Sequence, residues 1–73
     1  MEMTPAPVTI QINGTPREIP EPMTLTALLD LLGLAGKPVV VELNEAAVFA
    51  REYPVATVGD GDRIEIVTLA AGG

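Results

Sequence analysis

The pattern of hydrophobic and polar residues predicts three main strands. Every second residue from Val8 to Ile12 is apolar, and a similar alternation runs from Arg63 to Leu69. A period of two is typical of a strand that buries one face. Residues 39–43, Val-Val-Val-Glu-Leu, are rich in β-branched side chains and predict a central strand.

A tight hairpin is predicted after the first strand. Asn13-Gly14 tolerates the positive φ angles that both central positions of a type I′ turn require. The return strand would cover residues 15–19. Because Pro16 cannot donate a hydrogen bond to a neighbouring strand, this strand is predicted to lie at a sheet edge.

A short helix is predicted over residues 25–32. Thr24 can cap its first turn through the side-chain hydroxyl, and Gly33 stands where a left-handed residue ends many helices. Four leucines share one face: Leu25, Leu28, Leu29 and Leu32. A helix this short is marginal alone, so its leucine face must pack on the sheet.

The remaining segments complete an α+β chain. Residues 46–49 predict a short strand, residues 51–58 have no clean period and are expected to wrap the open end of the sheet, and residues 59–62 predict a turn. The helix would cross one face of a mixed sheet of four to five strands. If the first and last strands are parallel neighbours at the centre, the fold is a ubiquitin-like β-grasp; element order alone leaves that pairing open.

The expected organisation is one domain over residues 8–69. Residues 1–7 contain two prolines and no periodicity, and we expect a disordered extension there. Residues 70–73 would form a flexible tail. The chain has 73 residues, so its core must be thin.

Composition disfavours most catalytic and binding classes. The chain has no Cys and no His, so it offers no thiol nucleophile, no thiolate zinc site and no histidine general base. Its net charge of −6 would repel phosphate backbones and anionic lipid. No apolar run approaches the roughly 18 residues of a membrane span, and the first residues do not resemble a signal peptide. We therefore expect a cytoplasmic protein that is not an enzyme and contacts neither nucleic acid nor membrane.

The acidic turn at residues 59–62 has residues that could belong to a calcium loop, but it lacks the spacing. Counted from Asp60, the twelfth position, where an EF-hand needs Glu, is Ala71. We therefore interpret the turn as structural and expect no metal site. The other carboxylates show no spacing that selects a catalytic pair, so a solvated acidic surface, or one that docks a basic partner, is the interpretation.

The C-terminus offers a different kind of chemistry. Ala70, Ala71, Gly72 and Gly73 follow directly from the last predicted strand, and four residues with so little side chain could thread a narrow channel. Such a tail presents one functional group, the α-carboxylate of Gly73. Once activated, that carboxylate can accept a sulfur or nitrogen nucleophile, so the chain would be the carried acyl group. A floppy end is the alternative.

Strand parity predicts an exposed apolar patch beside this tail. If Val41 and Ile66 face the helix, then Val40, Val67 and Leu69 face outward, next to Glu42. We call Val40, Glu42, Val67 and Leu69 the docking face. Exposed apolar patches often mark partner surfaces, although isolated surface aliphatics are also common.

Several stretches together resemble the ThiS family of sulfur carriers in thiamine biosynthesis. They are the Val-Glu-Leu-Asn of residues 41–44, the Gly-Asp-Gly-Asp-Arg-Ile-Glu-Ile-Val of residues 59–67 and the terminal Gly72-Gly73. The resemblance covers residues 8–73. It departs at residues 49–53, Phe-Ala-Arg-Glu-Tyr, where the family often has Pro-Arg and then an aromatic residue.

The resemblance implies a ubiquitin-like β-grasp and a reaction cycle. An E1-like adenylating enzyme of the ThiF type would use ATP and Mg²⁺ to adenylate Gly73, and a persulfide donor would then convert it to a thiocarboxylate. A thiazole synthase of the ThiG type would receive the tail, with Gly72, Ala71 and Ala70 threading its channel. The chain itself would bind no cofactor.

Other functions remain open at this point. The small subunit of molybdopterin synthase shares the fold, the Gly-Gly end and the thiocarboxylate. Sulfur delivery to tRNA, or conjugation to protein lysines, would use the same terminus. A β-grasp interaction module would use no C-terminal chemistry at all.

Overall fold

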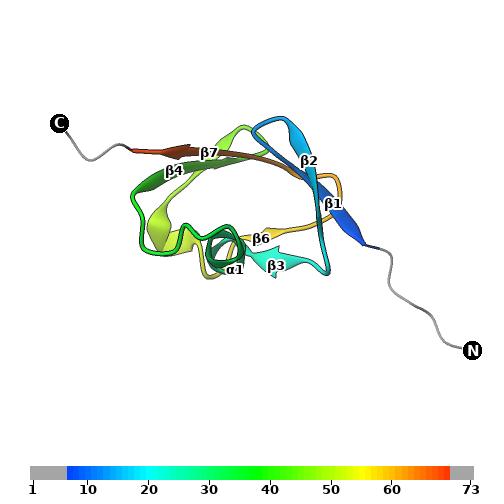
Figure 1. Ribbon diagram of the computed structural model, residues 1–73. Coiled ribbons are helices and arrows are strands. Elements are labelled where there is room, and N and C mark those ends of the chain that lie inside the picture. Colours follow the sequence, from blue (N-terminus) through cyan, green and yellow to red (C-terminus); the bar gives the residue numbers. More distant parts are fainter. Residues whose placement is uncertain (1–6, 70–73) are drawn as a thin grey trace, which may run out of the picture.

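A computed structural model of the chain describes residues 7–69 and contains a five-stranded mixed sheet (Figure 1). The strand order is β2-β1-β7-β4-β5, and β1 and β7 are parallel neighbours while the other pairs are antiparallel. The central parallel pair confirms the ubiquitin-like β-grasp. The strands are β1 Val8–Ile12, β2 Thr15–Ile19, β4 Val39–Leu43, β5 Ala46–Val48 and β7 Arg63–Thr68.

Tight turns connect two of the antiparallel pairs, β1 with β2 and β4 with β5. Asn13 and Gly14 have φ angles of 51° and 83°, as the predicted type I′ turn between β1 and β2 requires. Asn44 and Glu45 make the equivalent turn between β4 and β5, with φ angles of 50° and 72°. β2, which contains Pro16, lies at an edge of the sheet as predicted.

Helix α1, Leu25–Leu31, packs its leucine face on the sheet. The amide of Ala27 donates to Thr24 Oγ1 at 3.1 Å, which confirms the predicted cap. Gly33 has a φ of 76° just past the end of the helix. The helix is one residue shorter than predicted, because Leu32 is already its C-cap.

The segment after β5 departs from the sequence prediction. It contains the 3₁₀ helix η1, Ala50–Glu52, and the strand β6, Thr57–Val58, which pairs with β3, Met23–Thr24, in a small second sheet. Backbone carbonyls of the same segment accept hydrogen bonds from the first amides of α1. The sequence predicted no strand here, and that was wrong, because two-residue strands have too few positions to show a period.

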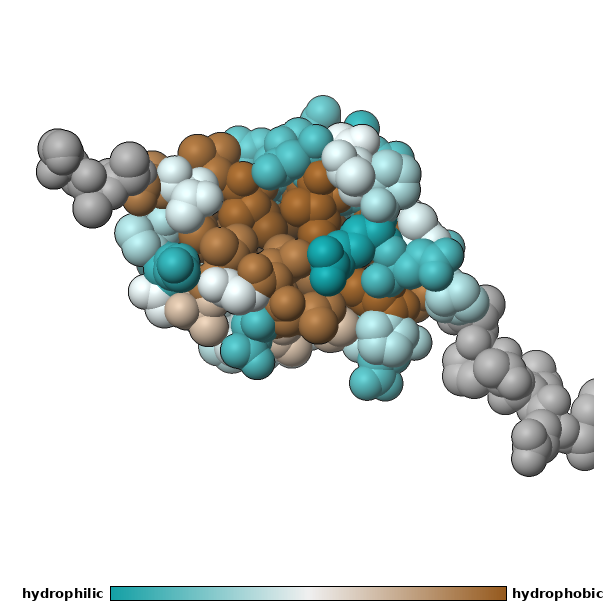
Figure 2. Space-filling model, in the orientation of Figure 1, coloured by the Kyte–Doolittle hydropathy of each residue, from teal (hydrophilic) through white to brown (hydrophobic). Residues whose placement is uncertain are grey.

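The core between sheet and helix is entirely aliphatic. Its ten buried residues are Val8, Ile10, Ile19, Leu25, Leu28, Leu29, Val41, Val58, Ile64 and Ile66. Phe49 is 58% exposed and Tyr53 lies at the core margin. Figure 2 shows apolar surface gathered between the sheet layer and the helix layer in this view. Within residues 7–69, α1 is far too short and no other helix is long enough to cross a bilayer.

Candidate functional site

The docking face lies on the side of the sheet opposite α1. Val40, Val67 and Leu69 are 46%, 57% and 50% exposed, whereas their strand neighbours Val41 and Ile66 are buried. The outward orientation predicted from strand parity is therefore confirmed. That this face binds a partner remains a prediction.

Apolar and acidic side chains pair across β4 and β7 on this face. Val40 lies opposite Val67, and Glu42 lies opposite Glu65. Together with Glu45, these four residues line a shallow concavity of about 350 Å³. The face is thus part apolar and part acidic, with the apolar part nearer the C-terminal end of β7.

Within residues 7–69, no cation lies directly opposite Glu42; Arg63 is the nearest basic residue along β7, two positions before Glu65 on the same face. The cross-strand neighbours of Glu42 are Ala47 on β5 and Glu65 on β7. Like charges directly opposite each other are destabilising in a sheet. The pair therefore lowers the stability of the free chain, and a cationic group brought from outside would relieve that repulsion.

Strand β7 runs directly from the docking face toward the predicted tail (Figure 1). The amide of Leu69 donates to the carbonyl of Pro38 at 2.9 Å, so the chain stays attached to the start of β4 at least to this residue. Figure 2 shows apolar surface where the chain leaves the domain. The predicted carrier residues Ala70, Ala71, Gly72 and Gly73 lie outside the described residues.

Two asparagine side chains fasten β7 to its neighbours. Asn13 Oδ1 accepts from the Ile66 amide at 2.7 Å, and its Nδ2 donates to the Ile66 carbonyl at 3.0 Å. At the start of β7, Asn44 Oδ1 accepts from the backbone amide of Arg63 at 2.9 Å. The backbone amide of Asn44 donates to the Arg63 carbonyl at 2.7 Å. The sequence analysis identified Asn13 only as a turn residue and did not predict either of these side-chain contacts.

The two carboxylates of the acidic turn between β6 and β7 accept hydrogen bonds from groups within the turn and beside it. Asp60 Oδ1 accepts from the Thr9 amide at 2.8 Å. Asp62 Oδ2 accepts from the Gly59 amide at 2.8 Å, and Asp62 Oδ1 accepts from Asn44 Nδ2 at 3.1 Å. These hydrogen bonds support the interpretation of the turn as structural.

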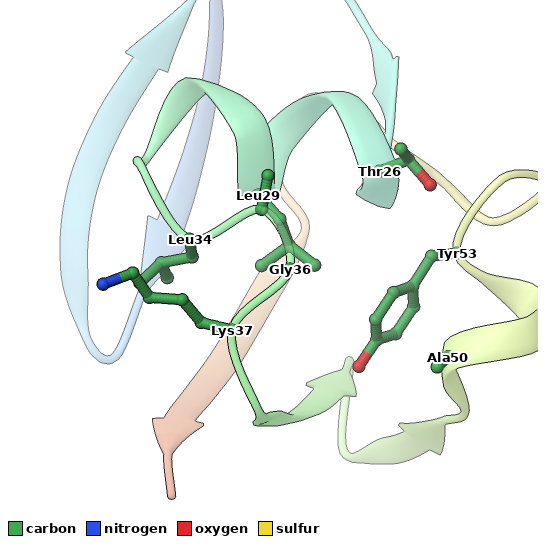
Figure 3. Close-up of a pocket in the computed structure, with 8 residues that line it drawn as sticks. Thr26, Leu29, Leu34, Gly36, Lys37, Ala50 and Tyr53 are labelled. Carbon is green, nitrogen blue, oxygen red and sulfur yellow. The ribbon is translucent and has the colours of Figure 1, made fainter. Parts of the chain in front are cut away.

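A second cavity of about 320 Å³ opens beside α1 (Figure 3). Its lining is mostly aliphatic: Thr26, Leu29, Leu34, Ala35, Gly36, Lys37, Ala50 and Tyr53. In Figure 3 the Lys37 side chain runs past Leu34, and its ammonium group points away from Tyr53. Sequence reasoning missed this cavity because most of its lining comes from loops without a period. Among the described residues, no charged group points into the cavity, so its lining does not indicate which class of ligand it would bind.

The chain is similar to sulfur carrier proteins along nearly its whole length. The model of the ThiS family matches residues 10–73. The sulfur carrier protein ThiS of Thermus thermophilus is 41% identical over 64 residues, which are 88% of this chain and 98% of that protein. The match to the relative spans most of this chain, and the match to the family model includes residues 70–73.

Two further similar proteins also match most of the chain. A thiazole synthase of Paramagnetospirillum magneticum is 42% identical over 62 residues, which are 85% of this chain and 19% of that longer protein. The crystal structure of a thiamine biosynthesis protein (ThiS) from Geobacter metallireducens has a TM-score of 0.79 and 32% identity, and the match covers 90% of this chain and all of that one, 100%.

Proposed function

The chain belongs to the ThiS family and is a sulfur carrier protein rather than a catalyst, and we propose that it delivers sulfur as a thiocarboxylate on Gly73. The observation that carries the proposal is the outward-facing pair Val67, on β7, and Leu69, directly after it; both precede residues 70–73 in the sequence. A partner bound there would hold the base of the tail while the terminus reaches its active site.

The proposed chemistry takes place on the carboxylate at the end of the chain. A carboxylate is a poor electrophile until its oxygen becomes part of a good leaving group. An E1-like adenylating enzyme of the ThiF type would supply that group from ATP and Mg²⁺, giving an acyl-adenylate at Gly73. The outer sulfur of a persulfide donor would attack the acyl carbon and expel AMP, giving an acyl disulfide. A thiol would then cleave the S–S bond, leaving the thiocarboxylate on Gly73 and a new disulfide on the donor side. Gly72, Ala71 and Ala70 would provide a backbone slim enough for a narrow channel.

The proposed acceptor is a thiazole synthase of the ThiG type. A protein described as a thiazole synthase contains a segment 42% identical to this chain. This supports the proposal that a carrier of this kind acts together with a thiazole synthase. The relatives named ThiS favour a carrier for thiamine biosynthesis over the alternative that this chain is the small subunit of molybdopterin synthase. We place the cycle in the cytoplasm, where ATP is available.

Intact mass spectrometry tests the proposal. The full chain is incubated with its cognate adenylating enzyme, ATP, Mg²⁺, a persulfide donor and a thiol reductant. We expect a mass increase that matches one oxygen replaced by sulfur, and no increase in the chain that lacks Gly73. A second carrier known to be loaded by the same enzyme serves as the positive control. If that carrier is loaded and this chain is not, the proposal is wrong and the chain is an interaction module.

A further inference from the structure

The two flanks of β7 carry backbone hydrogen bonds from alternate residues. On the β4 flank, the Arg63 carbonyl accepts from Asn44 and the Leu69 amide donates to Pro38. On the β1 flank, the carbonyls of Asp62 and Ile64 accept from the amides of Gln11 and Asn13. Even-numbered residues of β7 therefore turn their backbone groups toward β1, as alternation in a strand requires.

This β1 flank becomes unpaired one step before the tail. β1 pairs with β7 only as far as Ile12 opposite Ile64, and the Asn13 side chain then satisfies both groups of Ile66. The next even-numbered residue is Thr68. Among residues 7–69, no hydrogen-bond partner lies against its amide or carbonyl on this flank. In Figure 1, β7 and β4 extend past the β1–β2 hairpin toward the C-terminal end.

We propose that this open flank of β7, beginning at Thr68, receives an extended strand of the adenylating enzyme; this inference rests on the proposed function. Unpaired strand edges bind extended segments through main-chain hydrogen bonds. The added strand would start against the Asn13-Gly14 turn and run beside β7. Its side chains would contact Val67 on the outer face, so strand pairing and the docking face form one continuous surface.

Two other occupants fit the structure less well. One is the N-terminal segment, but β1 begins at Val8, at the opposite end of the sheet from Thr68, because β1 is parallel to β7 and pairs with its first half. A second copy pairing through Thr68 would add only the two backbone groups of one described residue, far from the roughly 1,200 Å² of buried surface that stable interfaces need. An enzyme that also encloses the tail has much more surface to offer.

Pairing at this position would fix the direction of the tail. From Thr68 to Gly73 there are five residues, which span at most about 17 Å when extended. A strand that holds Thr68 would therefore restrict where the Gly73 carboxylate can lie relative to bound ATP. Main-chain pairing would also accept many different side chains on the partner strand, because its hydrogen bonds depend on backbone geometry.

Substitution to proline removes the proposed donor, and no hydrogen bond given for residues 7–69 uses that amide. Thr68→Pro deletes an amide that faces solvent in the free chain, a placement that edge strands accept. Thr68→Ala keeps the amide and is the matched control. We expect Thr68→Pro to bind the adenylating enzyme at least tenfold more weakly than the wild type, with Thr68→Ala close to the wild type and all three unfolding at similar temperatures. Equal binding by the two variants would overturn the proposal.

Amide hydrogen exchange on the unmodified chain provides a second, independent test. The Thr68 amide is expected to exchange fast in the free chain and to become at least tenfold slower with the enzyme bound, while the Ile66 amide is slow in both states. Fast exchange at Thr68 in an enzyme complex that loads Gly73 would overturn strand pairing alone. Protection at Thr68 in the free chain, with a dimer in sedimentation, would assign the edge to a second copy. Failure of the wild type to bind or be loaded would instead reject the proposed function.

Discussion

The Asn13 side chain takes the place of a strand residue beside Ile66, accepting from its amide at 2.7 Å and donating to its carbonyl at 3.0 Å. The two residues are 53 positions apart. Asn13 can do this because its left-handed backbone, with a φ of 51°, turns the chain away from β7 and leaves the side chain behind to continue the ladder.

Replacing Asn13 should therefore cost more than an ordinary turn substitution. Asn13→Gly keeps the left-handed backbone accessible but removes both hydrogen bonds to Ile66, and we expect a loss of roughly 1–3 kcal/mol in the free energy of unfolding. The measurement is urea denaturation followed by circular dichroism. Glu45→Gly is the control, since Glu45 has a φ of 72° in the other hairpin turn and is exposed. Equal losses in both variants would show that the side-chain bonds contribute nothing.

The packing of helix α1 on the sheet should also contribute measurably to the free energy of unfolding. Leu28 is fully buried between α1 and the sheet, so Leu28→Ala should lower the free energy of unfolding by about 2–5 kcal/mol. Leu31, on the same helix, is 49% exposed, and Leu31→Ala should change it by less than about 0.5 kcal/mol. Thermal and urea unfolding of the two variants test the difference. A small effect at Leu28 would mean that the core re-packs around the missing side chain.

Much of this architecture was predictable because it follows from local chemistry. The alternation from Val8 to Ile12, the Asn13-Gly14 turn and the Thr24 cap each depend on residues next to each other in sequence. Strand parity extended that reasoning to the exposure of Val67.

The features that sequence reasoning missed depend on distant partners. The contact of Asn13 with Ile66 needs the parallel pairing of β1 and β7, which element order does not specify. The pairing of β3 with β6 involves two residues from each strand and leaves no periodic signal. The unpaired flank at Thr68 exists only because β1 ends early, so it becomes visible only once the register is known.

Reversing the polarity of the docking face should separate binding from folding. Leu69 is 50% exposed and lies after β7, outside the core, so Leu69→Glu should leave the unfolding temperature nearly unchanged. Loss of the apolar contact, with an added charge at the interface, should weaken binding to the adenylating enzyme at least tenfold. Leu31→Glu introduces the same charge at an exposed helix position and should bind normally. Calorimetric titration measures the binding of both variants, and thermal unfolding measures their stability. Parallel loss of stability and binding in Leu69→Glu would mean that Leu69 contributes to the core.

The facing carboxylates of Glu42 and Glu65 predict a trade between stability and association. Glu42→Lys replaces a repulsive cross-strand pair with an attractive one, and because both side chains are exposed the gain should be only roughly 0.2–0.5 kcal/mol. The same variant should slow association with a basic partner surface and flatten its dependence on salt concentration. Glu18→Lys changes the net charge equally but lies opposite Thr9, so it should not gain this stability. Denaturation and stopped-flow binding at two salt concentrations test both effects. Faster association of Glu42→Lys would show that the partner surface is acidic, and the carboxylates would then serve solubility instead of recognition.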